Sequence, residues 1–174
     1  EVTTPCWLGD GSDRPPVDEI LPCKSVMLHL PTMKTCKPTP AYFCMNGVNF
    51  DPDPAAKEPV EWLQFLRTIF HGDAESITLL QDWFGYCLTG DTSQQKMLLL
   101  VGPKRCGKGT IARVLTKLIG RGNVAGPTTS SLATDFGLQP LLGKSLAVVS
   151  DARFTGNNIQ TVIERLLCIS GEDL

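Results

Sequence analysis

The segment from residue 96 to residue 120 constrains the fold of this chain more than any other stretch. Lys96 to Val101 (KMLLLV) is a nearly continuous apolar run of strand length, which is typical of a parallel strand covered on both faces. A glycine-containing loop follows at once, and apolar residues then recur with helical spacing up to Gly120. The helical positions are Ile111, Val114, Leu115, Leu118 and Ile119. The sequence therefore predicts a strand, a tight loop and a helix in direct succession.

Residues 102–108 of this loop fit the pattern G-x-x-x-x-G-K. Backbone N–H groups can turn inward around a phosphate where glycines leave room, and the following helix N-terminus adds a partial positive charge. Lys108 supplies an ammonium that can reach the β- and γ-phosphates of a nucleotide. We expect phosphate contacts from Gly102, Pro103, Lys104, Arg105, Cys106, Gly107, Lys108, Gly109 and Thr110. The alternative is a glycine-rich turn with a surface lysine.

The residue after the lysine departs from the usual pattern. Ser or Thr commonly stands there and holds Mg²⁺ through its hydroxyl, but this chain has Gly109, followed by Thr110. A glycine has no hydroxyl, and Thr110 is better placed to contact a phosphate further along the nucleotide. The sequence therefore favours a magnesium ion held through water and by another acid.

Asp151 is the candidate for that acid. It follows a second apolar run, Ser145 to Ser150 (SLAVVS), and open parallel sheets place ligand-binding groups at the C-terminal ends of their strands. We expect Asp151 to bind Mg²⁺ through water and to act with Lys108 in catalysis. Ala152 stands where many ATPases have a second carboxylate, so the general base stays unassigned. A loop or capping role is the alternative for Asp151.

The first 57 residues are rich in proline and turn formers, with brief strands expected at Val26–Leu30 and Tyr42–Phe43. Two helices should follow. The first begins near Pro59, and the second is capped by Asp73 and ended by Gly90. The remaining expected elements are a short helix around Leu132–Leu142 and a helix that carries Ile159, Val162, Ile163, Leu166 and Leu167.

Composition narrows the class of protein. The chain has 174 residues, a net charge of −2 and 42% apolar residues. No apolar run approaches the ~18 residues of a membrane span, and no secretory signal is visible. The chain begins at Glu1 without Met and stops directly after an amphipathic helix. We therefore expect a piece of a longer protein that continues beyond Leu174.

Seven cysteines are present, an odd number without a C-x2-C pair. The spacing makes zinc binding by Cys6, Cys23, Cys36 and Cys44 a minority interpretation. A disulfide scaffold is also disfavoured, which indicates a reducing compartment, the cytoplasm.

Five segments together resemble the C-terminal half of the phage and plasmid primase-helicases. These proteins are superfamily 3 helicases and relatives of the poxvirus primase-helicase. The segments are Trp62–Phe70, Leu80–Thr89, Gly102–Thr110, Ser145–Asp151 and Ile169–Asp173. The resemblance extends from about Pro5 to the end of the chain.

The resemblance implies an α/β fold whose core is a P-loop, AAA+-like parallel sheet, incomplete at the C-terminus. Residues 1–95 would be a helicase-associated domain, small and mainly helical with an irregular lead-in. Residues 96–174 would be a truncated NTPase core. The implied activity of the full-length protein is ATP hydrolysis with Mg²⁺ coupled to DNA unwinding. It would act as a homo-hexamer that binds single-stranded or forked DNA in a bacterial or virus-infected cell.

The resemblance also implies an arginine finger beyond Leu174, so we expect this chain alone to bind ATP but hydrolyse it poorly. If it proved active by itself, the finger would be sought among Arg105, Arg113, Arg121, Arg153 and Arg165. Two alternatives remain open. One is a nucleotide-kinase-like phosphotransferase, because G-K-G-T also occurs in adenylate-kinase-like proteins. The other is a non-catalytic module that binds nucleotide to shape an assembly.

Overall fold

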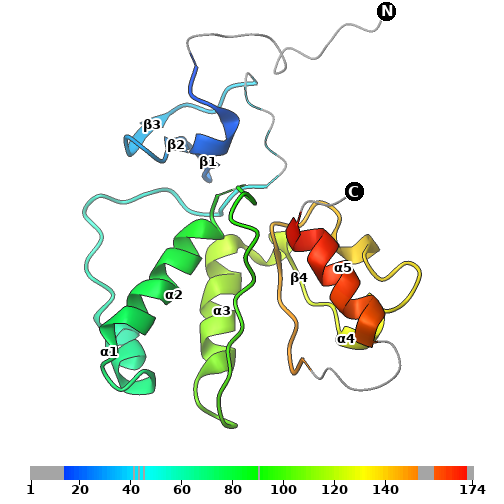
Figure 1. The fold of residues 1–174 in the computed structure, drawn as a ribbon. Helices are drawn as coiled ribbons and strands as arrows, with labels where there is room; N and C mark the ends of the chain where they lie inside the picture. Colours follow the sequence, from blue (N-terminus) through cyan, green and yellow to red (C-terminus); the bar gives the residue numbers. More distant parts are fainter. Residues whose placement is uncertain are drawn as a thin grey trace, which may run out of the picture. The chain divides into compact units, whose positions relative to one another are not determined.

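Helices and short strands are both present, which confirms a mixed α/β fold. The structure, a computed structural model, describes residues 14–40, 42, 44, 46–89, 91–152 and 159–171. Contacts divide the chain into two units, Glu1–Thr89 and Gly90–Leu174 (Figure 1). The sequence placed the domain boundary slightly later, after residue 95. The assignment of the two parts to a helicase-associated domain and an NTPase core stays a prediction.

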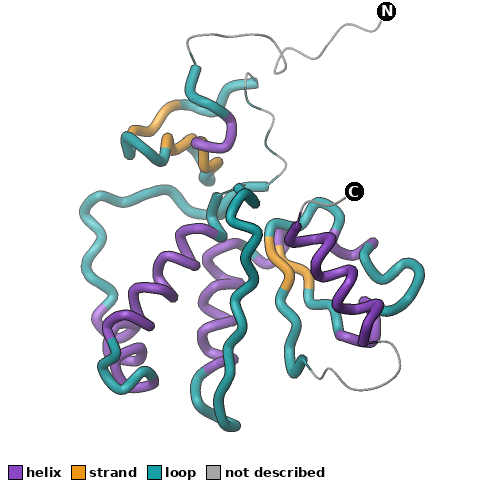
Figure 2. Tube along the Cα trace, viewed as in Figure 1, coloured by secondary structure: helices purple, strands orange, loops and turns teal. Residues whose placement is uncertain are grey.

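A small antiparallel sheet, in the order β1-β2-β3, forms the beginning of the first unit (Figure 2). Its strands are β1 (Ile20–Pro22), β2 (Met27–His29) and β3 (Lys34–Cys36), preceded by the 3-10 helix η2 (Val17–Glu19). Leu21 pairs with Leu28, and both are buried against Val48. The brief strand expected at residues 26–30 is confirmed by β2. Tyr42 is not in a strand, and Phe43 lies outside the described residues.

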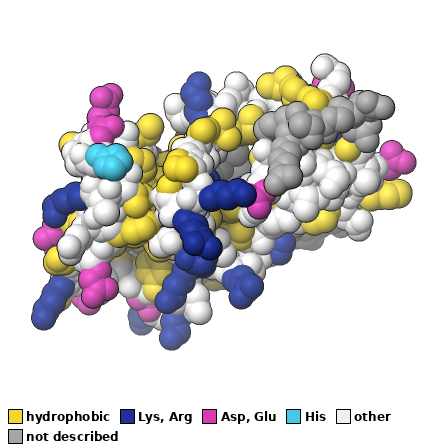
Figure 3. Space-filling model, turned by 90° about the horizontal axis from the view of Figure 1, so that it is seen from below, with side chains coloured by type: hydrophobic (Ala, Val, Ile, Leu, Met, Phe, Trp, Pro, Cys, Tyr) yellow, Lys and Arg dark blue, Asp and Glu magenta, His cyan; other side chains and the backbone are white. Residues whose placement is uncertain are grey.

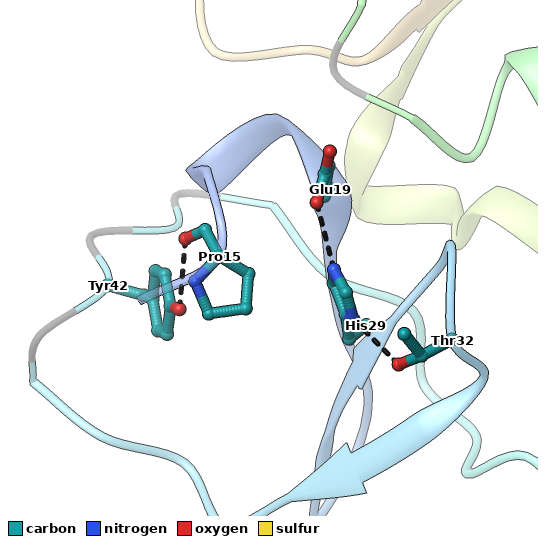
Figure 4. A network of polar contacts seen from close by, with 5 residues as sticks. All are labelled: Pro15, Glu19, His29, Thr32 and Tyr42. Carbon is teal, nitrogen blue, oxygen red and sulfur yellow. Dashed lines mark hydrogen bonds and ion pairs between the residues drawn. The ribbon is translucent and has the colours of Figure 1, made fainter. Parts of the chain in front are cut away.

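His29 ties η2 and the turn after β2 to the sheet. Its Nε2 atom lies 2.8 Å from Oε2 of Glu19, and its Nδ1 atom lies 2.7 Å from Oγ1 of Thr32 (Figure 4). Tyr42 donates a separate hydrogen bond of 3.1 Å from its hydroxyl to the carbonyl of Pro15. The histidine therefore has two local partners, which is the arrangement of a structural residue.

Two helices complete the first unit, α1 (Val60–Ile69) and α2 (Ala74–Tyr86). The expected helices are confirmed, although Pro59 occupies the N-cap rather than the first helical position. The ring of Trp62 stacks 5.4 Å from that of Phe65 and lies 5.8 Å from that of Phe84, which joins the helices. Leu66 and Leu80 are buried.

The start of α2 is confirmed and its end is corrected. Asp73 is the N-cap, and its side chain accepts hydrogen bonds from the backbone N–H groups of Glu75 and Ser76. The helix ends at Tyr86, and Cys87 and Leu88, which an end at Gly90 would include in the helix, follow it in a turn. Gly90, the expected terminator, lies outside the described residues.

The strand expected at residues 96–101 is not formed. The segment runs beside no strand within the described ranges, and it makes no backbone hydrogen bond there to another segment. Met97, Leu99 and Val101 are exposed by 56%, 72% and 84%. An apolar run of this kind is stable as a buried strand when neighbours pair with both of its edges and cover both faces. Among the described residues no strand pairs with either edge of this segment, so a P-loop parallel core is not shown.

A parallel pair does form, between β4 (Val124–Ala125) and β5 (Leu146–Ala147). Bonds from the N–H groups of Ser145 and Val148 extend the pairing on either side. The second strand, β5, lies inside the run 145–150 that the sequence marked as a strand. Its partner β4 was missed, because it lies in a stretch of glycine, proline, serine and threonine that we interpreted as a connection.

Helix α3 (Lys108–Ile119) is confirmed, with Ile111, Leu115 and Ile119 buried. Gly120 ends it with a φ of +92°, a value that suits glycine. A 3-10 helix, η3 (Arg121–Asn123), then leads into β4.

The helix expected around Leu132–Leu142 is wrong in position. The chain instead forms α4 (Thr129–Leu132), a series of turns and the 3-10 helix η4 (Gln139–Leu141). Thr128 and Ser131 cap α4 reciprocally in a capping box, which the sequence interpretation overlooked.

The last helix, α5 (Ile159–Gly171), matches its expected position and packs against α4. Its Arg165 donates hydrogen bonds to the backbone carbonyls of Leu132 and Thr134. None of the described helices has the length and apolar character needed to cross a membrane.

Replacement of Asp73 by Ala should lower the thermal unfolding midpoint at pH 7, because two backbone N–H groups lose their acceptor. The Ser76 side chain, and then backbone N–H groups, hold the pKa of Asp73 below its usual value. Its stabilising contribution is therefore complete above the unfolded pKa of ~3.9 and is lost as the pH falls through the folded pKa. The deficit of Asp73→Ala, followed by circular dichroism, should shrink below about pH 4. Asp82→Ala, in the same helix, is the control, and an equal deficit at pH 3 and pH 7 would contradict this role.

Replacement of Gly137 by Ala should destabilise the second unit. The added Cβ would lie 2.0 Å from the Ser131 carbonyl oxygen and 3.1 Å from Cα of Leu132, both backbone atoms. Overpacking of this kind costs about 1–3 kcal/mol of unfolding free energy, measured by denaturant titration. Gly122→Ala is the matched control, because a Cβ there meets nothing within 4 Å. Wild-type stability of Gly137→Ala would show that this loop is free to move away.

Candidate functional site

The loop between residue 102 and α3 makes a tight turn with two left-handed residues. Arg105 has a φ of +63°, and Gly107, the N-cap of α3, has a φ of +92°. Cys106 folds back over the start of the loop. Its Sγ atom lies 2.8 Å from the position that a Cβ on Gly102 would occupy. Glycine is required at both positions for local reasons, at Gly102 because Cys106 approaches closely and at Gly107 because of the positive φ, while the expected phosphate contacts stay a prediction.

The N-terminus of α3 presents backbone donors. Gly107 provides no side-chain cap, and its carbonyl accepts bonds from the N–H groups of Thr110 and Ile111 at 2.9 and 3.0 Å. The N–H groups of Lys108 and Gly109 have no acceptor among the described residues. No acidic residue lies in the first turn. Such a helix start favours an anion, since unpaired N–H groups and the helix dipole act in the same direction.

Lys108 turns its ammonium back into its own loop. Nζ donates to the carbonyls of Gly102 and Pro103, each at 2.8 Å, and approaches Sγ of Cys106 at 3.3 Å. An ammonium has three hydrogens, so these acceptors match its full donor capacity. The side chain is thus held inside the loop that the sequence assigned to phosphate.

Thr110 has a partner that the sequence interpretation missed. Nη2 of Arg113, one helical turn further along α3, donates to Oγ1 of Thr110 at 3.0 Å. Arg113 had been considered only as one of five possible arginine fingers. The signal was present in the sequence, because side chains three residues apart in a helix are neighbours and point toward its N-terminus. Gly109 lies between Lys108 and Thr110 in the sequence, and a Cβ added to it would meet no other atom within 4 Å.

Asp151 lies in the turn after β5, exposed and with a φ of +51°. Figure 1 draws the segment after β5 and the loop before α3 toward the same, lower end of the second unit. Within the described part of the chain, however, Asp151 makes no hydrogen bond or ion pair with Lys108 or with the rest of the loop. The structure therefore brings residues 102–110 together and shows no hydrogen bond or ion pair between them and Asp151.

The loop and the first half of α3 carry unneutralised positive charge. Lys104, Arg105, Lys108 and Arg113 form no ion pair with a carboxylate in the described ranges. Figure 3, which looks at the lower end of Figure 1, shows Lys and Arg side chains gathered near the middle of that face. Such a surface attracts anions.

The remaining basic and acidic residues of the second unit that could bear on the site differ in their surroundings. Lys144 donates from Nζ to the carbonyl of Gly122 at 2.6 Å, which joins the segments that lead to the parallel strands. Arg165 is engaged by two backbone carbonyls. Arg153 and the acidic pair Glu172–Asp173 lie outside the described residues.

The cysteines form no metal centre where the structure describes them. No group of three or more His, Cys, Asp or Glu side chains is placed to hold a metal there, and Cys6 lies outside this part. Burial raises the pKa of the Cys23 and Cys44 thiols, and raises that of Cys87 to about 11. A raised pKa disfavours the thiolate, which is the form that binds zinc.

Comparisons with known proteins bring no further assignment. No family model matches the chain, and no curated protein matches it either.

Proposed function

We propose that this chain binds the phosphates of ATP through residues 102–110. The observation that carries the proposal is the position of Lys108. Its ammonium lies inside a glycine-bounded loop, directly before a helix whose first N–H groups have no capping side chain. The alternative weighed from the sequence is a glycine-rich turn with a surface lysine, whereas the side chain of Lys108 is half-buried and bonded within the loop.

The loop offers two kinds of group to a phosphate. The unpaired N–H groups of Lys108 and Gly109 are donors at a helix N-terminus. Lys108 provides a charge that can exchange loop carbonyls for phosphate oxygens, because both are oxygen acceptors of the same ammonium. Lys104 and Arg105 add positive charge nearby. The bound nucleotide would supply a transferable γ-phosphoryl group, and the chain would supply position and charge.

We place Mg²⁺ at Asp151, an exposed carboxylate in the turn after β5, with water completing the coordination. The metal would then be held from the side of β5 rather than by the residue after Lys108. Gly109 supports this arrangement, since it offers no oxygen from a side chain.

The larger assignment is the ATPase core of a replicative DNA helicase of the phage and plasmid primase-helicase type, acting as a hexamer on DNA. The order of elements supports it: extended segment, glycine loop, helix, parallel strand, then second parallel strand and acid. Residues 97–101 also alternate in exposure, with Leu98 and Leu100 half-buried and their neighbours exposed. This period of two is typical of an extended segment with one covered face, although no strand pairs with the segment among the described residues.

Replacement of Lys108 by Ala tests the loop assignment. Hydrogen bonds to charged groups contribute ~1.5–3 kcal/mol, so ATP should bind roughly ten- to a hundred-fold more weakly in calorimetry. Lys117→Ala, in the last turn of the same helix, removes an equal charge and should bind ATP as the wild type does. Unchanged affinity in Lys108→Ala would refute phosphate binding at this loop.

Replacement of Asp151 by Asn tests the metal assignment. The variant should lose affinity for ATP when Mg²⁺ is present and keep wild-type affinity in EDTA, because only the metal-bound nucleotide needs the carboxylate. Asp135→Asn, an exposed aspartate of the α4–η4 segment, is the control. Equal losses with and without Mg²⁺ would show that Asp151 acts on the fold of its turn.

A further inference from the structure

The contact between Arg113 and Thr110 carries an inference that rests on the proposed function and extends it. Thr110 is half-buried in the first turn of α3, and Arg113 is exposed one turn later. Nη2 of Arg113 reaches back to Oγ1 of Thr110 at 3.0 Å. This places a guanidinium beside the one hydroxyl in the first turn of the helix.

Hydrogen-bond accounting at Oγ1 gives that hydroxyl a direction. A threonine oxygen has one hydrogen and two lone pairs. The Arg113 N–H occupies a lone pair, so the threonine hydrogen is turned away from the arginine and is available to an acceptor. A hydroxyl held in this way is a donor toward an anion.

The charge of Arg113 acts in the same sense. A guanidinium stays protonated at all relevant pH values, and no carboxylate among the described residues pairs with this one. A positive charge that reaches back toward a helix N-terminus is disfavoured by the helix dipole unless an anion is bound there. The same charge, 3.0 Å from Oγ1, disfavours a divalent cation on that oxygen.

The geometry points to Arg113 as a positioning residue that fixes Thr110 as a hydrogen-bond donor to a phosphate oxygen of the nucleotide and keeps Mg²⁺ off this hydroxyl. In most loops of this pattern a hydroxyl next to the lysine serves the metal. Here the hydroxyl is one residue later and is committed to phosphate by its arginine. Affinity for the phosphates should therefore depend on Arg113 and Thr110 whether or not metal is present.

A double-mutant cycle with ATP, titrated in EDTA and in Mg²⁺, tests this. Arg113→Gln and Thr110→Val should each weaken binding about tenfold, by the same factor in both buffers. The double variant should bind ATP no more weakly than the single variant with the lower affinity for ATP, because either change removes the same positioned donor, the Thr110 hydroxyl. Thr110→Ser should restore most of the affinity, and Lys117→Gln should behave as wild type.

The possible results separate the two proposals. If Arg113→Gln binds ATP normally while Lys108→Ala does not, the role of Arg113 is refuted and the loop assignment stands. If Lys108→Ala also binds normally, the loop assignment itself fails. Two other results would overturn the positioning role. One is that the losses of ATP affinity in the two single variants add up in the double variant. The other is that Thr110→Val loses ATP affinity only when Mg²⁺ is present, which would show that the hydroxyl binds the metal. Arg113→Lys keeps the positive charge but not the planar guanidinium, so it should bind ATP with an affinity between those of the wild type and Arg113→Gln. This variant provides the test if Arg113→Gln does not fold.

Discussion

The ammonium of Lys108 is the group on which the arrangement of the loop depends. The carbonyls of Gly102 and Pro103 converge on it from the start of the loop, and Cys106 approaches it from the end. Without a cation between them, these negatively polarised groups would face one another. A bound phosphate would have to draw Lys108 away from these acceptors. The affinity for phosphate therefore depends on the difference between the bonds that Lys108 makes to phosphate and those it makes to the loop. The backbone N–H groups of Lys108 and Gly109 have no acceptor among the described residues, so they can bind phosphate without giving up a partner.

Local signals in the sequence were sufficient to locate α1, α2, α3 and α5. Asp73 caps α2 because its own carboxylate accepts hydrogen bonds from the first N–H groups of the helix. Gly120 ends α3 because glycine adopts a positive φ without strain. Strands depend on partners elsewhere in the chain, so local signals predicted them less well than the helices. The apolar run 96–101 has strand composition but no strand beside it in the described residues, whereas Val124–Ala125 has little strand signal and is paired through β5. The short helix α4 was misplaced by several residues because its capping box, Thr128 to Ser131, was overlooked.

The candidate site was predictable to the extent that it is continuous in sequence. Residues 102–110 come together because a turn and a helix start bring them together, whatever the rest of the chain does. Asp151 is 43 positions after Lys108 in the sequence, and its approach to the loop depends on how the strands assemble. Among the described residues no hydrogen bond or ion pair joins Asp151 to the loop, so the role of Asp151 stays a prediction. Arg113 is the opposite case, since helical spacing alone would have placed it beside Thr110.

Two non-glycine residues of the candidate site, Arg105 and Asp151, have a positive φ. The described non-glycine residues with positive φ are Met33, His71, Gln95, Arg105 and Asp151. Holding an ordinary residue in this conformation costs of order 1–3 kcal/mol, although aspartate tolerates it better than arginine. Arg105 is an exposed loop residue where glycine would be free of strain, so its conformation is imposed by the turn between Pro103 and Gly107. The same turn directs the Gly102 and Pro103 carbonyls toward Lys108, so the strain at Arg105 accompanies the geometry that keeps the lysine inside the loop.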